Sequence, residues 1–436
     1  MPFVLTLPAP RLASLILIAA AGSAAADTEV GVMAIPDLSG IVTQPSAIAQ
    51  DGSVAGSYRP FGGSSSFRGF EYRASGAFNV LEPIQDDTPT NLLNEEAFVT
   101  AVLPDGTGLG YSDTRFGISQ NAVIWNNPAS PSSPFGGTES SFGGVSEGAT
   151  SFIWGANNLG DYVGGRELSG GGNLTPFVWL AGAADPQFLS LPAGATSADA
   201  RGISDNGHIA VQASVPGVGF VGFFYDNAGN PAIDMGSLGG PGTRPAAVND
   251  AGEVVGTALN PSSTRRAFYW DAATGNRAAP AGGSLRYSFL LDINSSGDAV
   301  GYSRRTGSGQ RDFAYVFNVR TGQLTFLRTL LSLDLRNQWE LREAFAINDR
   351  GQIVGTGRFN GSVETFIFQL PGYPDGPAPC NVADLADPPG VLDLADIAAF
   401  VDAFTMNTPL ADLDGNGLYD LADIALFVTA FSAGCP

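Results

Sequence analysis

The sequence predicts a mainly β protein, in which a seven-bladed β-propeller is followed by a small all-α calcium-binding module of paired loop-helix motifs. Three observations predict this architecture. A glycine-containing phrase recurs seven times, two similar acidic segments lie between the only two cysteines, and an apolar segment typical of export lies near the N-terminus. We therefore expect a signal peptide at 1–26, the propeller at 27–370, a Pro/Gly linker at 371–379 and the module at 380–436.

Residues 1–26 have the features of a secretory signal peptide. Arg11 precedes the apolar stretch 12–21, and three alanines at 24–26 supply the small residues of a cleavage site. The apolar stretch is too short to cross a bilayer, and no other stretch reaches the roughly 18 apolar residues that a spanning helix needs. We expect a secreted mature chain that begins at Asp27 and has no transmembrane segment.

The central region is a repeat array. Its phrase places a glycine after Asn-Asp or a similar pair, as in Val248-Asn-Asp-Ala-Gly252 and Ile347-Asn-Asp-Arg-Gly351. The seven marker glycines lie 45 to 54 residues apart and are Gly52, Gly106, Gly160, Gly207, Gly252, Gly297 and Gly351. Seven copies at this period indicate a solenoid or a propeller. The Asn-Asp-x-Gly segments are predicted to be hairpin turns rather than metal loops, because Asn, Asp and Gly are the residues that tight turns require.

Each repeat is predicted to contain four short β-strands, which is the organisation of a propeller blade. The third strand ends in aromatic residues, and Trp125, Trp179 and Trp270 at this place are expected to pack between blades rather than to stack on sugars. The seventh repeat has no fourth strand, because the chain leaves through 371–379. The segment Gly31–Leu38 is similar to a fourth strand of the array. We expect it to complete the last blade and so to cover the open sheet edge.

The second acidic segment fits a twelve-residue calcium loop. Such a loop has oxygen ligands at positions 1, 3, 5, 7, 9 and 12 and a sharp turn at position 6. The corresponding ligands are Asp412, Asp414, Asn416, the carbonyl of Leu418, Asp420 and Asp423, and Gly417 is at the turn. The sequence therefore predicts a Ca²⁺ site in this loop.

The first acidic segment matches the calcium pattern less completely. The matching residues are Asp387, Gly390, Asp393 and Asp396, at positions 3, 6, 9 and 12. Asp384 reaches position 1 only if one residue is inserted, and Pro389 at position 5 has no side-chain oxygen. Calcium binding by this loop stays open at the level of the sequence.

Each loop leads into a predicted helix with an apolar stripe. The stripes, at spacings of 3, 4 and 3, are Leu394, Ile397, Val401 and Phe404, and Leu421, Ile424, Val428 and Phe431. If two such helices pack antiparallel, Cys380 and Cys435 come together. A disulfide between them would add roughly 4 kcal/mol in the chain-entropy treatment, which a module this small needs.

The duplicated loop-helix with Asp at position 12 resembles a type I dockerin. The flanking cysteines and the ending Gly434-Cys435-Pro436 resemble more narrowly the GC-type dockerin of secreted bacterial proteins. The resemblance implies a calcium-dependent module that docks onto a cohesin-like or cell-envelope receptor. It also implies partner contacts at loop positions 10 and 11, which are Leu394-Ala395 and Leu421-Ala422 in this chain, where cellulosomal dockerins often have Ser-Thr. Ordinary cellulosomal pairing is therefore not expected. The repeat phrase is similar to the HAF family of predicted extracellular repeats, over roughly residues 30–370.

Composition argues against several classes of function. A net charge of −21 argues against nucleic-acid binding, which needs a basic surface. One histidine and two cysteines leave no His-based triad with a Cys nucleophile and no His-rich metal site. Carboxylates for glycoside hydrolysis exist, but no sequence rule brings two of them together; the candidates are Glu71, Glu95, Glu96, Glu147 and Glu343.

Two functions are compatible with these features. The preferred one is a non-enzymatic, secreted binding or scaffold protein, with a polysaccharide or protein ligand on the propeller and attachment through the calcium-binding module. The alternative is a glycoside hydrolase or polysaccharide lyase on the propeller, tethered by the same module to a polysaccharide-degrading assembly.

Overall fold

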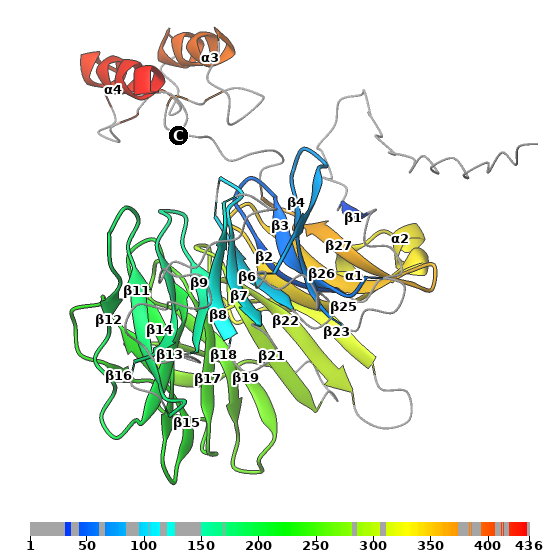
Figure 1. The fold of residues 1–436 in the computed structure, drawn as a ribbon. Helices are drawn as coiled ribbons and strands as arrows, with labels where there is room; N and C mark the ends of the chain where they lie inside the picture. Colours follow the sequence, from blue (N-terminus) through cyan, green and yellow to red (C-terminus); the bar gives the residue numbers. More distant parts are fainter. Residues whose placement is uncertain are drawn as a thin grey trace, which may run out of the picture.

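The propeller occupies most of the structure (Figure 1), a computed structural model. The structure describes residues 31–35, 43–60, 66–83, 96–103, 105–113, 120–126, 150–168, 171–280, 286–305, 311–373, 383, 385, 394–405, 411, 413 and 418–433. Within these ranges, seven antiparallel sheets follow one another around a central axis. The first strands of successive blades lie side by side, and the first strand of the last blade lies beside that of the first blade, so the ring is closed.

The first four blades follow the order of the repeats. They comprise β2 (Thr43–Ile48), β3 (Val54–Tyr58), β4 (Arg68–Tyr72) and β5 (Phe78–Leu81); β6 (Ala97–Val102), β7 (Gly108–Asp113) and β8 (Gln120–Trp125); β9 (Ser151–Ala156), β10 (Tyr162–Glu167), β11 (Leu174–Trp179) and β12 (Gln187–Phe188); and β13 (Ser197–Ile203), β14 (Ile209–Val215), β15 (Gly219–Tyr225) and β16 (Ile233–Asp234). Blade 2 has three strands within the described residues.

The last three blades close the ring. They comprise β17 (Thr243–Val248), β18 (Val254–Leu259), β19 (Arg265–Asp271) and β20 (Gly275–Ala278); β21 (Tyr287–Ile293), β22 (Asp298–Arg305), β23 (Arg311–Asn318) and β24 (Leu324–Phe326); and β25 (Trp339–Ile347), β26 (Gln352–Phe359), β27 (Ser362–Gln369) and the N-terminal β1 (Val32–Ala34). Strand β1 pairs antiparallel with β27, with Met33 opposite Ile367. The prediction that an N-terminal strand completes the last blade is confirmed.

The hydrophobic core lies between neighbouring blades. Trp125 and Trp270 are 1% and 3% exposed, which confirms that these aromatic residues pack inside the ring. Trp179 is only partly buried; its ring stacks on Tyr162 at 5.7 Å and its indole N–H donates to the Ala183 carbonyl. Trp179 nevertheless packs against a cluster shared by blades 2 and 3, so the interblade packing holds for all three tryptophans, the third at a partly exposed position.

A second glycine of the repeat phrase is required by close packing. Every first strand has a β-bulge, and in six blades a glycine of the second strand lies opposite it. At Gly301 and Gly164, an added Cβ would collide with the carbonyl oxygens of Phe289 and Phe152. The phrase therefore contains one glycine for the turn and one for the bulge.

Two short helices between β24 and β25 were not predicted. They are α1 (Leu327–Leu330) and α2 (Leu333–Gln338), and Ser332 caps α2 by accepting a hydrogen bond from the Leu335 N–H. Leu327 is fully buried against the last two blades. In the part of the chain that the structure describes, no helix is long and apolar enough to span a membrane.

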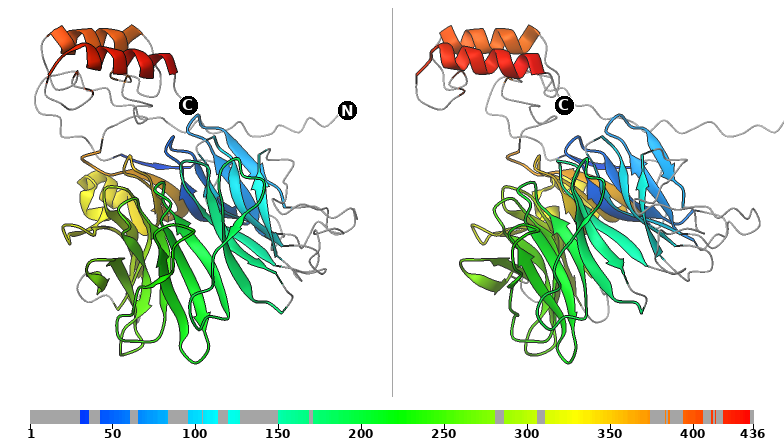
Figure 2. Two further views of the ribbon diagram at one scale, coloured as in Figure 1. Left: turned by 90° about the vertical axis from the view of Figure 1, so that its left-hand side faces the viewer. Right: turned by 60° about the vertical axis from the view of Figure 1, so that its left-hand side comes forward.

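The C-terminal region contains two helices that lie side by side, α3 (Leu394–Thr405) and α4 (Leu421–Ala433) (Figure 2). Phe400 and Phe427 are each 5% exposed, and their rings stack at 4.2 Å. The predicted stripes are partly wrong, because Val401 and Val428 are 50% and 54% exposed and Leu421 is more exposed still. Both helices are apolar on most of their surface, so periodicity alone does not choose a face, and the large phenylalanine rings take the interior.

Candidate functional site

The seven repeat phrases fold into the same hairpin turn at one end of the central channel. All seven marker glycines have positive φ, between 69° and 90°. In each turn the glycine N–H donates to the carbonyl three residues earlier; Gly252, for example, donates to Asn249. This geometry is a three-residue loop with a glycine bulge, so the prediction of hairpin turns is confirmed.

The asparagine of the phrase, which is present in blades 3, 5, 6 and 7, links its blade to the next. Its side-chain amide donates to the carbonyl of the equivalent residue in the following blade. The four bonds run from Asn157 to Ser204 (3.1 Å), Asn249 to Asn294 (3.0 Å), Asn294 to Asn348 (3.2 Å) and Asn348 to Ala49 (2.8 Å). The last of these crosses the closure between blades 7 and 1. The Oδ1 atom of each asparagine also accepts N–H groups of its own turn.

The aspartate of the phrase makes a second set of links. Its carboxylate accepts a backbone N–H from the turn of the preceding blade. The bonds are Asn158 to Asp205 (2.7 Å), Asn206 to Asp250 (3.0 Å) and Ser295 to Asp349 (2.7 Å). Asn-Asp therefore recurs because both side chains connect blades, a role that sequence reasoning missed.

We predict that Asn348→Ala destabilises the ring. Asn348 is 3% exposed, and its loss leaves the carbonyl of Ala49 and the N–H groups of Arg350 and Gln352 without this partner. Because an unsatisfied buried group costs about 1–3 kcal/mol, urea unfolding should show a loss of at least that size. Asn230→Ala, at an exposed position, should change stability by less than about 0.5 kcal/mol. Equal midpoints for the two variants would contradict the link.

Tyr373, which the sequence assigns to the linker, contacts the propeller. Its hydroxyl donates to Asp298 (2.6 Å) and accepts from the Asn294 amide (2.9 Å). Its ring lies so close to Gly351 that a Cβ there would collide with it. The start of the predicted linker is therefore held against the turns of blades 6 and 7.

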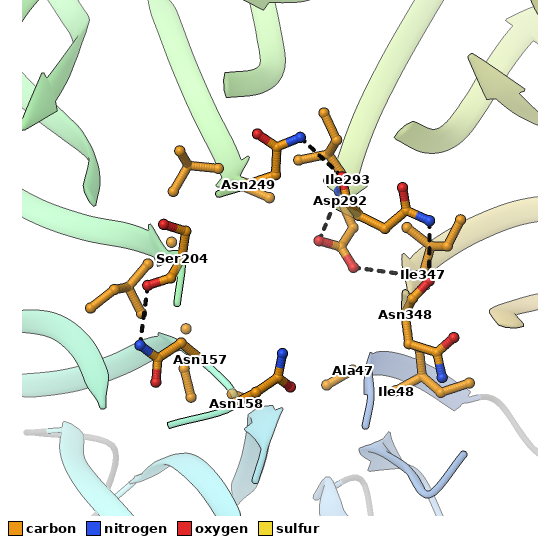
Figure 3. Close-up of a pocket in the computed structure, with 18 of the residues that line it drawn as sticks. Ala47, Ile48, Asn157, Asn158, Ser204, Asn249, Asp292, Ile293, Ile347 and Asn348 are labelled. Carbon is orange, nitrogen blue, oxygen red and sulfur yellow. Dashed lines mark hydrogen bonds between the residues drawn. The ribbon is translucent and has the colours of Figure 1, made fainter. Parts of the chain in front are cut away.

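The first strands enclose a cavity of about 240 Å³ on the channel axis (Figure 3). All seven blades line it, through the bulges and the residues that lead to the turns. The residue after the bulge is small in six blades: Ala47, Ala101, Gly155, Gly202, Ala247 and Ala346. In blade 6 the equivalent residue is Asp292. The repeat alignment therefore identifies a single carboxylate at this level of the channel.

Asp292 is held by two backbone N–H groups. Ile293 and Ile347 each donate to its carboxylate at 2.9 Å (Figure 3). Burial raises the pKa of Asp292 to about 7, the two N–H groups act in the opposite direction, and the nearby Asp349 carboxylate raises it further. The channel therefore contains an acid that titrates near neutral pH.

We predict a pH dependence of stability that depends on Asp292. An unfolded Asp ionises near pH 4, whereas folded Asp292 keeps its proton to about pH 7. Between these values the folded state binds more protons, so its stability falls as pH rises, and above pH 7 this contribution is constant. The melting temperature of Asp292→Asn relative to the natural chain should therefore be higher at pH 8 than at pH 5. A pH-independent difference would contradict the raised pKa.

Between blades 6 and 7, two carboxylates share one arginine. Arg304 binds Asp312 through Nε (2.7 Å) and Nη2 (2.8 Å) and reaches Glu343 through Nη2 (3.3 Å). Burial and the Asp312 carboxylate raise the pKa of Glu343, and Arg304 opposes them. Of the glutamates considered from the sequence, Glu343 is thus brought beside a second carboxylate.

The other candidate glutamates do not form such a pair within the described residues. Glu71 is 1% exposed and forms an ion pair with Arg73. Glu96 accepts the N–H of Phe67 at 3.2 Å. Glu95 and Glu147 lie outside the described residues.

In the C-terminal module, the position-12 aspartates are buried. Asp396 and Asp423 are 1% and 0% exposed. Leu385 N–H donates to Asp396 at 2.7 Å, and Leu413 N–H donates to Asp423 at 2.8 Å. Asp423 also accepts the N–H of Asp420. Each carboxylate thus connects the end of its loop to the start.

The remaining predicted ligands are only partly described. Leu418 and Asp420 are described with Asp423, and Leu394, Ala395, Leu421 and Ala422 lie in the first turns of their helices. Outside the described residues lie Asp384, Asp387, Asp393, Asp412, Asp414, Asn416, Cys380 and Cys435. Calcium binding and the disulfide therefore stay predictions. Leu421 and Ala422 are exposed, as a partner contact requires.

Seven antiparallel sheets arranged in a closed ring define the class of this protein, which is a seven-bladed β-propeller protein. No model of a known protein family matches the chain, and no curated protein matches it. Similar solved structures include a prolyl endopeptidase (TM-score 0.45, 14% identity, covering 66% of this chain and 42% of that one) and TolB from Acinetobacter baumannii (0.38, 9%, 74% and 80%). A puromycin hydrolase has a TM-score of 0.44 at 13% identity, covering 72% of this chain and 50% of that one. The chain spans less than half the length of the prolyl endopeptidase, and at these scores the similarities carry no argument about function.

Proposed function

We propose that this protein is a secreted, non-enzymatic binding or scaffold component, in which a β-propeller is held at the cell exterior by a calcium-dependent, dockerin-like module. The propeller presents the ligand surface and the C-terminal helices attach it to a cohesin-like or cell-envelope receptor. Calcium holds the two loops of the module in their docking conformation.

One observation carries the proposal: two buried carboxylates lie in a region without basic side chains. Asp396 and Asp423 are almost completely buried, while residues 371–436 contain ten Asp and no Arg, Lys or His. A buried carboxylate needs a compensating positive charge. A divalent cation bound by carboxylates and carbonyls supplies the missing charge.

The hydrogen bonds of the two loops also support calcium binding by the first loop. Leu413 follows Asp412, the first ligand of the second loop, and its N–H binds Asp423. Leu385 follows Asp384 and makes the equivalent bond to Asp396. This correspondence favours the alignment with one inserted residue, in which Asp384 is a ligand.

An exposed apolar surface on the module supports docking. Leu421 is 79% exposed, Val428 54% and Val401 50%, although these helices have other apolar residues in their shared core. Exposed apolar side chains grouped on so small a module are typical of a protein–protein contact.

Retention on cell envelopes tests the proposed function. The mature chain should bind isolated bacterial envelopes in millimolar calcium and be released by a chelator. Leu421→Asp should reduce this binding by about tenfold or more, since it places a charge in an apolar contact. Leu333→Asp is a matched control, because Leu333 is 76% exposed on α2 of the propeller. Calcium-independent retention, or equal effects of the two variants, would reject the proposal.

The alternative, a polysaccharide hydrolase, has one observation in its favour, the carboxylates of Glu343 and Asp312 on Arg304. A raised pKa at Glu343 is what a general acid needs. Turnover of a polysaccharide that Glu343→Gln abolishes, with unchanged melting temperature, would establish the alternative.

A further inference from the structure

A groove of about 200 Å³ lies between blades 4 and 5, at the end of the ring away from the hairpin turns. It is formed by the start of β15, the start of β17, the end of β18 and the start of β19. Apolar side chains form much of its wall, including Val218, Phe220 and Leu259. Val218 and Phe220 are 52% and 36% exposed. The groove is therefore open to solvent and smaller than the about 300–1,000 Å³ of drug-sized pockets.

Two arginines line this groove. The Arg244 guanidinium, on β17, lies 4.1 Å from the centre of the Phe220 ring. Arg265 also lines the groove from β19, which β18 separates from β17, and its guanidinium lies 5.9 Å from the centre of the Phe289 ring of blade 6. Among the described residues, no carboxylate lies within ion-pair distance of either arginine. Arg201 of the adjacent blade is paired with Asp199 at 2.7 Å.

The grouping of these arginines is unusual for so acidic a chain. The protein has 42 Asp and Glu against 21 Arg, so carboxylate partners are abundant. Burial lowers the pKa of Arg244, and the charges of Arg265 and Arg201 lower it further. Mutual repulsion of unpaired cations costs stability, and a bound anion would remove that cost.

We propose that this groove binds a compact organic carboxylate, whose carboxylate lies between Arg244 and Arg265 and whose apolar ring lies on Phe220, Val218 and Leu259. The planar guanidinium group can bind a carboxylate through two parallel hydrogen bonds. The small volume admits one ring-sized group, and the apolar wall favours a hydrocarbon ring over a sugar. The surrounding negative charge of the protein disfavours long polyanions.

The proposal deepens the proposed function, because it rests on the propeller as the ligand-binding part and names a ligand class for it. It does not need calcium. The titration is therefore run in calcium and in chelator, so that failure of the docking module leaves the result unaffected.

Isothermal titration of the full chain with benzoate tests the proposal, with benzyl alcohol as the neutral analogue and galacturonate as the sugar carboxylate. Benzoate should bind, more weakly at high salt, while benzyl alcohol should bind about tenfold more weakly or not at all. Arg244→Gln and Arg265→Gln should each weaken benzoate binding by about tenfold or more, because each removes a charge-assisted hydrogen bond.

Two further variants separate binding from folding. Val218→Glu places a negative charge on the exposed rim and should also weaken binding, without touching the core. Arg358→Gln, at an exposed arginine on β26 of blade 7, removes the same charge elsewhere and should leave binding unchanged. Absence of benzoate binding, equal binding of benzyl alcohol, or variants that bind like the natural chain would overturn the proposal. Tighter binding of galacturonate than of benzoate would overturn the apolar-ring assignment.

Discussion

Removal of residues 31–35 is expected to open the ring and cause the largest loss of stability of any short deletion. This segment provides β1, the strand that covers the edge of β27. It also provides Ile35, which is 0% exposed, donates its N–H to Thr365 (3.0 Å) and packs in a cluster with residues of blades 1 and 7. Without it, the backbone groups of β27 are free to pair with another chain. Unfolding followed by calorimetry, together with size-exclusion chromatography, should show a lower melting temperature and self-association.

Point variants give a sharper form of this prediction. Ile35→Ala should cost about 2–5 kcal/mol, the usual range for truncating a buried isoleucine. Met33→Ala in the same strand should change stability by less than about 0.5 kcal/mol, because Met33 is 46% exposed. If both variants unfold at the same urea concentration, β1 does not hold the ring closed.

Asp423→Ala is expected to remove calcium-dependent stabilisation of the C-terminal module. The variant loses a predicted ligand and leaves the N–H groups of Leu413 and Asp420 without their acceptor, at about 1–3 kcal/mol each. A ligand at 100 times its dissociation constant adds about 2.7 kcal/mol to the free energy of unfolding. Calorimetry of the mature chain should show an upward shift of one transition with calcium in the natural protein and none in Asp423→Ala.

Two controls separate calcium binding from loss of structure. Asp423→Asn keeps the shape and one acceptor but removes the charge, so it should retain helicity in chelator while losing most of the calcium response. Asp185→Ala removes a carboxylate at an exposed position of the propeller and should behave like the natural chain. A calcium response that survives in Asp423→Asn and Asp423→Ala would show that the second loop is not the site.

Ring closure could be predicted because the strand that closes the ring has the sequence pattern of a fourth strand. The segment Gly31–Leu38 matches the fourth strand of blade 4, and the match extends to burial. Ile35 corresponds to Met235, at 0% and 2% exposed, and Met33 corresponds to Ile233, at 46% and 43%. Successive side chains of a strand point to opposite faces of the sheet, so two strands with the same sequence pattern bury the same positions. Strand β1 therefore takes the fourth-strand position in blade 7, as β16 does in blade 4.

The buried face of the C-terminal helices could not be predicted in the same way. Val401 and Phe400 are adjacent, and both satisfy an apolar stripe of helical spacing when the helix is apolar on most sides. Only the packing of Phe400 on Phe427 selects between them. The sequence therefore predicted two helices and part of their interior face: Ile397, Phe404, Ile424 and Phe431 pack against the core, whereas Leu421, Val401 and Val428 are exposed.

The number of blades, their strands, the turn glycines and the N-terminal closing strand are determined by the sequence itself, because each depends on contacts between residues near in the chain or on repetition. The links from asparagine to the next blade, the single carboxylate of Asp292 in the channel, and the placement of Arg244 and Arg265 along one groove depend on the tertiary structure. These residues are close only because the ring closes and the bulges turn particular side chains toward the axis or the groove. The local sequence pattern predicts the strands of a single blade, whereas the asparagine links, the Asp292 carboxylate and the arginine groove involve residues from neighbouring blades.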